Sequence, residues 1–409
     1  MKVLHAVHCY APAIGGVETV IGTVSEMLVG VHGDEVTVST TNCLSAEGFV
    51  HPDRTVIPAG ETIENGVVVR RHKVARRQAP LLRRGQAAAW RLRIPGNQYL
   101  RVAWQGPWSR GMTRDLLRTN ADVVVAASFP LLHMFVAAVA KRRSGRPLVF
   151  HGALHPLDAW GYDRPMIVRA IKRCDAYIAY TGWEREFVIS AGVDPSKIHV
   201  VGLGVDVARF ATADGRAFRD DYGLGDAPIV TFIGQQSGTK GIDTLVEAMK
   251  RVWSDVLEAR LVLAGARTAF TPRLIEMIGA LPSAFRDQVI LIHDFREEEK
   301  AGIMAACDVF AYPSRYESFG LAYLEAWAAS KPVIGARSGA VASVIAEGKD
   351  GLLVEPGNSE ELAQAILTLL TDPARRADLG ATGHAKVVRS HTWEQVTGAV
   401  RRVYATAAR

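Results

Sequence analysis

Two glutamates separated by eight positions, Glu317 and Glu325, are the carboxylates with the clearest chemical interpretation. A single helix carrying both would separate them by ~12 Å along its axis, at a rise of about 1.5 Å per residue. The carboxylate pair of a glycoside hydrolase is only ~5–9.5 Å apart, so this spacing favours contacts with the two ends of an extended ligand. Residues 318–321 would present amides at a helix N-terminus, which favours a bound diphosphate. Two ordinary surface glutamates are the alternative, but Glu325 lies among Leu, Ala and Trp, where a lone carboxylate is costly.

Two Gly-containing turns follow predicted strands and could approach a phosphate. Residues 234–241 (GQQSGTKG) resemble a P-loop in outline, but Gly241 stands where a P-loop has Ser or Thr, so a Mg²⁺ ligand is missing. Lys240 still suits an anionic oxygen, with a solvated loop lysine as the alternative. The turn at Gly15 and Gly16 could bind phosphate or be a plain tight turn. It lacks the G-x-G-x-x-G pattern, so a nicotinamide site is not expected.

Histidines also follow predicted strands. His151 and His155 stand in VFHGALH, and His8 follows the first strand. A loop at a strand end is where a histidine that contacts substrate would lie, although lone histidines are more often structural. No H-E-x-x-H pattern occurs, and the four cysteines form no C-x-x-C pair. Neither a metal site nor a disulfide scaffold is therefore predicted, and the thiols are expected to be reduced, as in the cytosol.

The elements that must position these residues alternate between short strands and helices. Apolar runs such as KVLHAVHC and ADVVVAAS alternate with helical patterns, and the alternation restarts at APIVTFIGQ after a link near residues 204–226. Strands of four to eight residues between helices indicate parallel, doubly wound sheets. The 409-residue chain is therefore predicted to be an α/β protein with two facing Rossmann-like domains. Ligands bind beyond the carboxyl ends of parallel strands, so the active site is expected in the interdomain cleft.

Charge is unevenly distributed along the chain. Residues 1–205 carry 25 Lys and Arg against 16 Asp and Glu, and residues 65–114 contain twelve basic side chains and no acidic one. Tryptophans are interleaved in that segment, at positions 90, 104 and 108. Basic and aromatic residues together suit an anionic membrane surface, at ~1 kcal/mol per cation near the head groups. A solvated basic face is the alternative; nucleic acid is not expected as a partner, because no nucleic-acid-binding module is recognisable.

Residues 123–140 carry no full charge, and the stretch is long enough to be considered as a membrane-spanning helix. Pro130 and His133 interrupt the stretch, and three basic residues follow it. A buried strand followed by a helix that starts near the proline explains it better than a spanning helix. The start of the chain likewise indicates a strand and a loop rather than a cleaved signal peptide. The expected location is cytoplasmic, with peripheral contact at the inner face of the cell membrane through residues 65–114.

Together these segments resemble the retaining glycosyltransferases of the GT-B fold, in glycosyltransferase family 4. The resemblance rests on GGVE, FHG, GVDPSKIHVVGLGVD, GQQSGTKG and YESFGLAYLEAWAASKPVIGARSGAV, and it is weakest over residues 50–115. It implies an acceptor-binding domain over residues 1–204 and a nucleotide-sugar-binding domain over 205–390. A C-terminal helix at about 391–409 would pack back onto the first domain. The implied activity is transfer of a hexose from a UDP- or GDP-sugar to a saccharide or lipid-linked saccharide, in polysaccharide or glycolipid biosynthesis.

The resemblance also implies roles for individual residues. Glu317 would bind the donor sugar, Glu325 the ribose, and Lys240 the diphosphate, while His151 would lie near the reacting carbon. His151, Lys240 and Glu317 are thus the expected catalytic residues, with no metal or other cofactor required. The other expected donor-binding residues are Gly16, Gln235, Phe295, Arg296, Ser318, Phe319, Gly320 and Leu321.

Two positions depart from the family pattern. Gln235 stands where the family usually has arginine, which removes a bidentate phosphate contact; Arg315 is a candidate replacement. The usual Gly-Gly-x-Pro-Glu is replaced by residues 339–343 (GAVAS), without its glutamate. A subunit that binds sugar nucleotide or scaffolds a polysaccharide assembly complex without turnover is therefore the alternative function. An epimerase or dehydrogenase would need the dinucleotide fingerprint that is missing.

Overall fold

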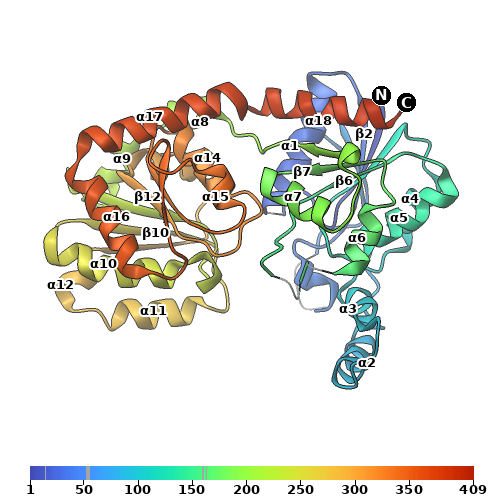
Figure 1. Cartoon of the computed structure of the whole chain (residues 1–409), viewed down its shortest axis with the longest axis horizontal. Coiled ribbons are helices and arrows are strands. Elements are labelled where there is room, and N and C mark those ends of the chain that lie inside the picture. The colour runs from blue at the N-terminus through green and yellow to red at the C-terminus, as the bar shows by residue number, and fades with distance from the viewer. Residues whose placement is uncertain (14, 52–55, 159–160, 163) are drawn as a thin grey trace. The chain divides into compact units, whose positions relative to one another are not determined.

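The computed structural model describes residues 1–13, 15–51, 56–158, 161–162 and 164–409. These residues form two compact units, each with its own sheet (Figure 1). The first unit comprises Met1–Gly202 and Trp393–Arg409, and the second comprises Leu203–Thr392. The first unit is therefore built from two separate stretches of the chain.

The first unit contains an eight-stranded sheet in the order β3-β4-β2-β1-β5-β6-β7-β8. All neighbouring strands are parallel except β3, which is antiparallel to β4 at one edge. The strands are β1 Lys2–Ala6, β2 Glu35–Thr41, β3 Gly60–Glu64, β4 Val67–His72, β5 Val123–Ala126, β6 Leu148–His151, β7 Ala176–Ala179 and β8 Ile198–Val200.

Helices of the first unit cover its sheet and extend from it. They are α1 Gly16–Gly30, α2 Ala79–Arg91, α3 Asn97–Gln105, α4 Arg110–Arg118, α5 Leu132–Ser144, α6 Pro165–Ile171, α7 Gly182–Ser190 and α18 Trp393–Ala407. The last helix, α18, contacts α1 and strands β5, β6 and β7. Strands β5, β6 and β7 are buried along their whole length, which is why each is a nearly continuous run of Val, Ala, Ile and aromatic residues.

The second unit contains a six-stranded, fully parallel sheet in the order β11-β10-β9-β12-β13-β14. Its strands are β9 Ile229–Ile233, β10 Arg260–Gly265, β11 Val289–His293, β12 Val309–Tyr312, β13 Val333–Ala336 and β14 Gly351–Val354. Its helices are α8 Val207–Ala211, α9 Gly215–Asp221, α10 Ile242–Asp255, α11 Thr271–Gly279, α12 Ser283–Arg286, α13 Lys300–Ala306, α14 Leu321–Ala328, α15 Val341–Val344, α16 Ser359–Thr371 and α17 Pro373–Ser390.

Each sheet consists mainly of parallel strands connected by helices, which confirms the expected α/β class with two Rossmann-like units. The uncharged stretch at residues 123–140 forms strand β5 and most of helix α5. Among the described residues, no helix has both the length and the apolar composition needed to cross a membrane.

The basic segment at 65–114 does not form one surface. Its first part is strand β4, in which alternate residues face the interior, so that Arg71 is only 7% exposed. Arg71 donates to Glu64 and to the carbonyl oxygen of Ala11, while Arg70 pairs with Glu61. The remainder forms the start of α4, with Arg110 and Arg114, and helices α2 and α3, which pack on each other as a hairpin extending from the body of the first unit (Figure 1). The hairpin keeps most of its cations exposed beside exposed apolar side chains.

Candidate functional site

The predicted donor-binding residues of the second unit lie at one edge of its sheet. Parallel strands end at the same edge, and the loops after β9, β11 and β12 contain Lys240, Arg296 and Glu317 respectively. Hydrogen bonds join these loops to one another. The Arg315 amide donates to the Thr239 carbonyl at 3.0 Å, and the buried Gln236 amide group lies 3.0 Å from Nδ1 of His293 at the end of β11.

Lys240 and Glu317 form the ion pair at the centre of this edge. Nζ of Lys240 is 2.5 Å from Oε1 of Glu317, with side chains 20% and 11% exposed. The same ammonium lies 5.9 Å from the centroid of the Tyr312 ring. Lys240 therefore has a carboxylate and an aromatic face as partners, and its partial exposure leaves it accessible to an anionic ligand.

Gly241 explains why no Ser or Thr follows the lysine. Its φ is +75°, and a Cβ atom there would lie 2.2 Å from the carbonyl oxygen of Pro313. A side chain at this position would separate the loop after β9 from the loop after β12. The glycine therefore maintains the close approach of these loops, which brings Lys240 to Glu317.

Glu325 is buried in α14 and pairs with Lys300, the first residue of α13. Burial raises the pKa of the Glu325 carboxyl, and the neighbouring Lys300 ammonium opposes this shift without cancelling it. Lys300 is also 3.8 Å from Glu297. The sequence interpretation missed Lys300 because it stands in a charged run, REEEK, that resembles a solvated loop; a buried glutamate that requires a partner was the available signal.

The helix-based spacing of the two glutamates is wrong. Helix α14 begins only at Leu321, with Gly320 in a left-handed conformation at its N-cap, so Glu317 and Ser318 lie in a non-helical loop. An axial rise per residue therefore does not relate Glu317 to Glu325. The amides at the start of α14 still lack partners within the helix, as at any helix N-terminus. Phe319 is buried and packs edge-on against His391 within the second unit.

The two consecutive glutamines have different environments. Gln235, a predicted donor contact, has an exposed side chain. Gln236 is fully buried, donates to the carbonyl oxygen of Gly265 and accepts from Thr271. Gln235 is thus available to a ligand, whereas Gln236 holds the ends of neighbouring strands together.

The loop predicted to hold the nucleotide base follows β11. Phe295 is half-buried, and Arg296 is 76% exposed at its side chain and 3.5 Å from Glu299. The Arg296 amide donates to the Glu299 carboxylate at 2.7 Å, which fixes the loop where α13 approaches. These contacts fix the shape of the loop.

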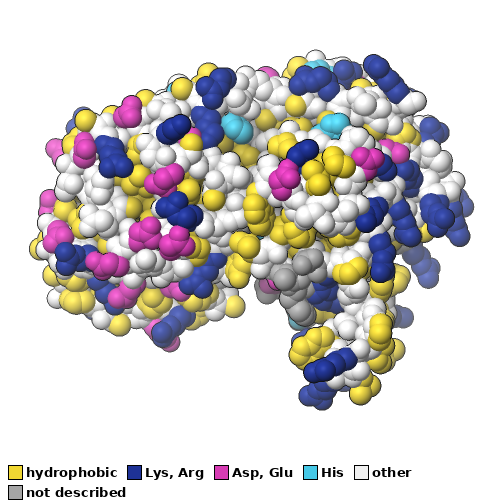
Figure 2. Space-filling view, in the orientation of Figure 1, with side chains coloured by type: hydrophobic (Ala, Val, Ile, Leu, Met, Phe, Trp, Pro, Cys, Tyr) yellow, Lys and Arg dark blue, Asp and Glu magenta, His cyan; other side chains and the backbone are white. Residues whose placement is uncertain are grey.

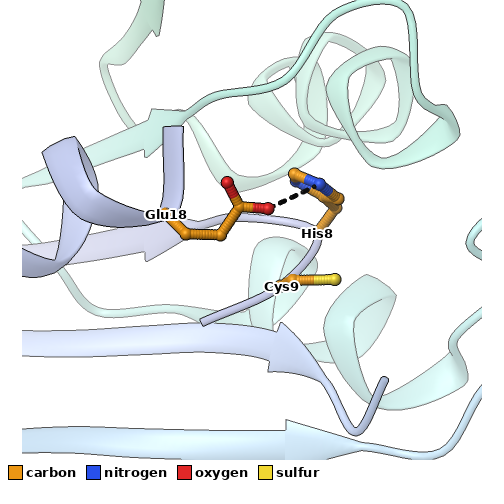
Figure 3. A group of neighbouring side chains, drawn as sticks. All are labelled: His8, Cys9 and Glu18. Atoms are coloured by element: carbon orange, nitrogen blue, oxygen red, sulfur yellow. Dashed lines mark ion pairs between the residues drawn. The ribbon is translucent and has the colours of Figure 1, made fainter. Parts of the chain in front are cut away.

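In the first unit, the GGVE turn positions a carboxylate against a histidine. Nε2 of His8 is 3.0 Å from Oε1 of Glu18, and Figure 3 shows the two side chains facing each other. A Cβ atom at Gly15 would lie 2.3 Å from the Glu18 carboxylate, so glycine is required for Glu18 to fold back. Burial raises the pKa of Glu18, but the hydrogen bond and charge of His8 outweigh it, and the net pKa is lowered. Gly16 starts α1 with an exposed backbone.

The ligating atoms of His8, Cys9 and Glu18 lie within 4.8 Å of one another, which makes them a potential metal-binding group. However, Cys9 is fully buried in an apolar cluster with Cys43, Phe49 and Val74. Burial raises the pKa of its thiol far above the usual value, which opposes the thiolate that a metal needs. Nδ1 of His8 is engaged by Ser128 at 2.7 Å. The group fits a His–Glu ion pair over an apolar thiol better than it fits a metal site.

The expected contact of His151 with a donor sugar is not what the structure shows. The side chain is 1% exposed, and its nitrogens are 3.2 Å from the Tyr180 hydroxyl and 2.7 Å from the Tyr404 hydroxyl. Burial lowers the pKa of His151 to about 3, so the ring is neutral. With both nitrogens occupied, His151 connects β6 to α18 and holds a structural position.

Glu184, which the sequence interpretation missed, fixes the loop after β6. Its buried carboxylate accepts from the amides of Leu154 and Tyr180 and from the Tyr177 hydroxyl, the last at 2.6 Å. Burial raises its pKa to about 7, although these hydrogen bonds oppose the shift. The loop that contains His155 is therefore shaped from beneath by a helix residue about thirty positions later in the chain.

Two family models match the chain. The model described as Glycosyltransferase Family 4 covers residues 14–209, and the model described as Glycosyl transferases group 1 covers residues 215–386. The two matches together extend over nearly all of both units.

Curated relatives include D-inositol 3-phosphate glycosyltransferase 2 of Catenulispora acidiphila, 32% identical over 71% of this chain and 74% of that protein. The D-inositol 3-phosphate glycosyltransferase of Xylanimonas cellulosilytica is 33% identical, and the match spans 58% of each chain. The chain therefore matches little more than half of the length of some of these relatives. Alpha-maltose-1-phosphate synthase of Mycolicibacterium smegmatis is 28% identical over 74% of this chain and 86% of that protein.

Solved structures share the fold along almost the whole chain. Anabaena Alr3699/HepE in complex with UDP is similar with a TM-score of 0.74 and 20% identity, over 99% of this chain and all of that chain. Sucrose-phosphate synthase of Thermosynechococcus elongatus has a TM-score of 0.75 at 20% identity, over 99% of both chains. The two sheets, the two family models and the Catenulispora relative agree, and the chain belongs to glycosyltransferase family 4, with the GT-B fold.

Proposed function

We propose that this protein transfers a hexose from a nucleoside diphosphate sugar to a saccharide or lipid-linked saccharide, with retention of the anomeric configuration. The observation that carries the proposal is the half-buried Lys240–Glu317 pair at the carboxyl edge of the second sheet. A cation there suits a diphosphate, and a carboxylate beside it suits sugar hydroxyls. Family membership supports glycosyl transfer as the reaction.

The proposed reaction breaks the bond between the anomeric carbon and the diphosphate oxygen and forms a bond to an acceptor oxygen on the same face. The acceptor's proton passes to the departing phosphate oxygen. Lys240 and the amides at the start of α14 stabilise the charge that develops on the leaving diphosphate, so this chemistry requires no metal ion. Glu325, held by Lys300, is assigned to the ribose hydroxyls.

UDP-glucose is the first donor to test. The solved HepE structures are complexes with UDP, with UDP and glucose, and with UDP-glucose. Exposed Gln235 favours slower turnover than an arginine would give, because a neutral amide stabilises a phosphate less than a guanidinium does. A non-catalytic subunit that binds sugar nucleotide is therefore the second candidate.

The decisive experiment compares thermal stabilisation by UDP, GDP, ADP and TDP in the wild type, Lys240→Ala and Lys250→Ala. Lys250 is a matched control, because it also pairs with a glutamate of the second unit, Glu247, at 2.6 Å. A nucleotide at 100 times its Kd adds ~2.7 kcal/mol of stability. One nucleotide should stabilise the wild type and Lys250→Ala, and the effect should be at least halved in Lys240→Ala.

Turnover is measured next with the sugar nucleotide of that base, in the presence and absence of EDTA. Release of nucleoside diphosphate that depends on a saccharide acceptor and is unchanged by EDTA supports the transferase reaction without a metal. Binding without release at any acceptor favours the non-catalytic subunit. If none of the four nucleotides stabilises the wild type, the donor site proposed here is incorrect.

Peripheral contact with an anionic membrane at its cytoplasmic face is proposed for the α2–α3 hairpin. Leu81, Trp90 and Leu92 are 75%, 59% and 73% exposed, and exposed arginines lie between them along α2 and just beyond it. Figure 2 shows apolar and basic side chains together on this projection. An apolar surface flanked by cations is the composition that inserts at a lipid interface. The proposal fits a lipid-linked acceptor, because both would meet at the membrane.

A further inference from the structure

A large open pocket lies within the first unit. Its volume is about 920 Å³, and it is formed by α4, the start of α5 and the segment that leads into α2. Its apolar lining includes Met112, Leu116, Leu117 and Val136, with Trp108 at one side. Pockets of ~300–1,000 Å³ with apolar walls are typical of sites for small molecules. No residue discussed for the donor lines this one.

Basic side chains supply the charged part of the same pocket. Arg110, Arg114 and Arg118 line it, and all three are exposed. They are four residues apart along α4, so they project from one side of the helix. The described lining contains no Asp or Glu. An apolar cavity with three guanidinium groups on its rim is complementary to an amphiphile with an anionic head and an apolar chain.

One histidine of the pocket lining is buried. His133 lines the pocket and is 2% exposed, and its Nδ1 is buried without a hydrogen-bond partner among the described residues. Its Nε2 lies 2.7 Å from the Ala127 carbonyl oxygen, which can only accept. Nε2 is therefore the protonated nitrogen, and Nδ1 is a free acceptor. Burial lowers the pKa of His133 to about 3, so the ring stays neutral and adds no charge to the pocket lining.

The pocket also connects two features already described. Its wall includes Ala75 and Gln78, directly before α2, so it opens beside the base of the exposed hairpin. The ring of His133, another lining residue, lies nearly parallel to that of His8 with centroids 6.4 Å apart, and His8 pairs with Glu18 of the GGVE turn. A ligand in the pocket would thus extend from the hairpin toward the carboxyl edge of the first sheet.

We infer that this pocket binds the apolar chain of a lipid phosphate, with the phosphate on Arg110, Arg114 and Arg118. The inference deepens the proposed function, because it names a phosphate-bearing lipid as the class of acceptor. Only the role of this lipid as the acceptor rests on the proposed function, because binding of the lipid itself requires no donor. Charge complementarity and the continuity with the apolar hairpin select a lipid rather than a protein segment.

The test measures binding of monomeric dodecyl phosphate to the full-length protein by calorimetry. Val136→Trp fills the pocket, while Val139→Trp makes the same change on the same helix at a position that is 54% exposed and does not line it. Arg114→Glu reverses a rim charge, and Arg142→Glu makes that change on an exposed arginine outside the pocket. We expect at least tenfold weaker binding for Val136→Trp and at least fivefold for Arg114→Glu, with less than twofold change in both controls.

Head and chain are separated by two further probes. Inorganic phosphate, which lacks the chain, and dodecyl maltoside, which lacks the charge, should each bind at least tenfold more weakly than dodecyl phosphate. Equal effects of Val136→Trp and Val139→Trp, equal binding of the maltoside, or no binding of dodecyl phosphate would each overturn the inference. Nucleotide stabilisation measured on the same variants distinguishes the two proposals: it should be unchanged by Val136→Trp, and its absence in the wild type would contradict the donor site alone.

Discussion

Gln235 and Gln236 are adjacent and chemically identical, yet one is exposed and the other is fully buried. The turn after β9 leaves Gln235 exposed to solvent and directs Gln236 onto the ends of β10 and β11. Only the first can interact with a ligand. Substituting each glutamine separately therefore tests whether the exposed side of this turn contacts the ligand.

Gln235→Arg should tighten binding of the nucleoside diphosphate that stabilises the protein. A charge-assisted hydrogen bond exceeds a neutral one by roughly 1 kcal/mol or more, which corresponds to about five- to tenfold in Kd. Calorimetric titration of the wild type and the variant checks this. Gln236→Arg is the contrasting variant: it buries an unpaired charge and should lower the melting temperature instead. Unchanged affinity in Gln235→Arg would remove residue 235 from the phosphate site.

Gly241 offers a second test at this scale, because Gly223 is a close control. Both glycines have positive φ, +75° and +62°, but a Cβ atom at Gly223 would meet nothing within 4 Å. Gly241→Ala should therefore destabilise the protein by roughly 1–3 kcal/mol more than Gly223→Ala, since only the first displaces the Pro313 carbonyl. It should also weaken nucleotide binding. Equal unfolding midpoints in urea for the two variants would show that the loops do not need this close approach.

At the scale of elements, the α2–α3 hairpin combines exposed apolar residues with cations, while β4 pairs Arg70 and the buried Arg71 with glutamates of β3. The arginines of β4 therefore have structural partners, whereas most of those of the hairpin, which begins at about residue 79, are exposed. Only the interfacial part is expected to affect membrane binding.

Leu92→Asp should reduce binding to vesicles that contain anionic phospholipid by about tenfold or more. The change removes an apolar side chain that would be buried in the membrane, and it adds a negative charge that the anionic head groups repel. Leu257→Asp, at a position of the second unit that is 49% exposed, is the control for the added charge alone. Co-sedimentation at low and high salt measures both. If the wild type binds anionic vesicles no better than neutral ones, the hairpin is simply a solvated basic surface.

Sequence patterns predicted the central elements well and the peripheral ones poorly. Strands such as β5 and β9 are buried on both faces and appear as continuous apolar runs, so they were recognisable. Strand β4 was missed because its second half, Arg70, the inward Arg71 and His72, is polar, which merged the strand with the basic run that follows. Arg71 is buried only because Glu64 of the neighbouring strand neutralises it, and a pairing of strands is not visible in composition.

The residues of the candidate site also differ in how far the sequence could predict them. Lys240 and Glu317 were recognised from local spacing, but their contact depends on two loops 77 residues apart. His151 had the spacing of a substrate contact, yet Tyr404, 253 residues away, occupies one of its nitrogens. Local patterns therefore identified candidates, while long-range packing decided which of them stay available.

At the scale of the whole molecule, the two units differ in their buried histidines. His5, His133 and His151 are each about 1–2% exposed in the first unit, and burial lowers the pKa of each to about 3. No histidine among the described residues of the second unit is buried to that degree. Below pH 6.5 the unfolded first unit binds more protons than the folded one, so its stability falls as pH falls toward 3. The raised pKa of Glu184 has the opposite effect on stability, but it is one group against three histidines.

The first unit should therefore unfold before the second on acidification. Each pH unit below 6.5 costs about 1.4 kcal/mol per histidine until the folded-state pKa is reached. Hydrogen exchange at pH 5 and pH 7.5 should show peptides from residues 1–202 losing at least about tenfold more protection than those from 203–392. His151→Gln, which can still hydrogen-bond both tyrosines, should reduce the difference. Uniform loss across both units would contradict this account.

Helix α18 follows the second unit in the chain but completes the first, through Val396, Val400, Val403 and Tyr404 on its buried face. During synthesis the ribosome must therefore produce all of residues 203–392 before this helix emerges. At ~5–20 residues per second, that interval lasts roughly 10–40 s. Throughout it, the nascent first unit presents an uncovered apolar surface and a His151 that lacks its Tyr404 partner. Such a surface is a natural substrate for chaperones, and ribosome-bound chains stalled before residue 393 are where their engagement would be detected.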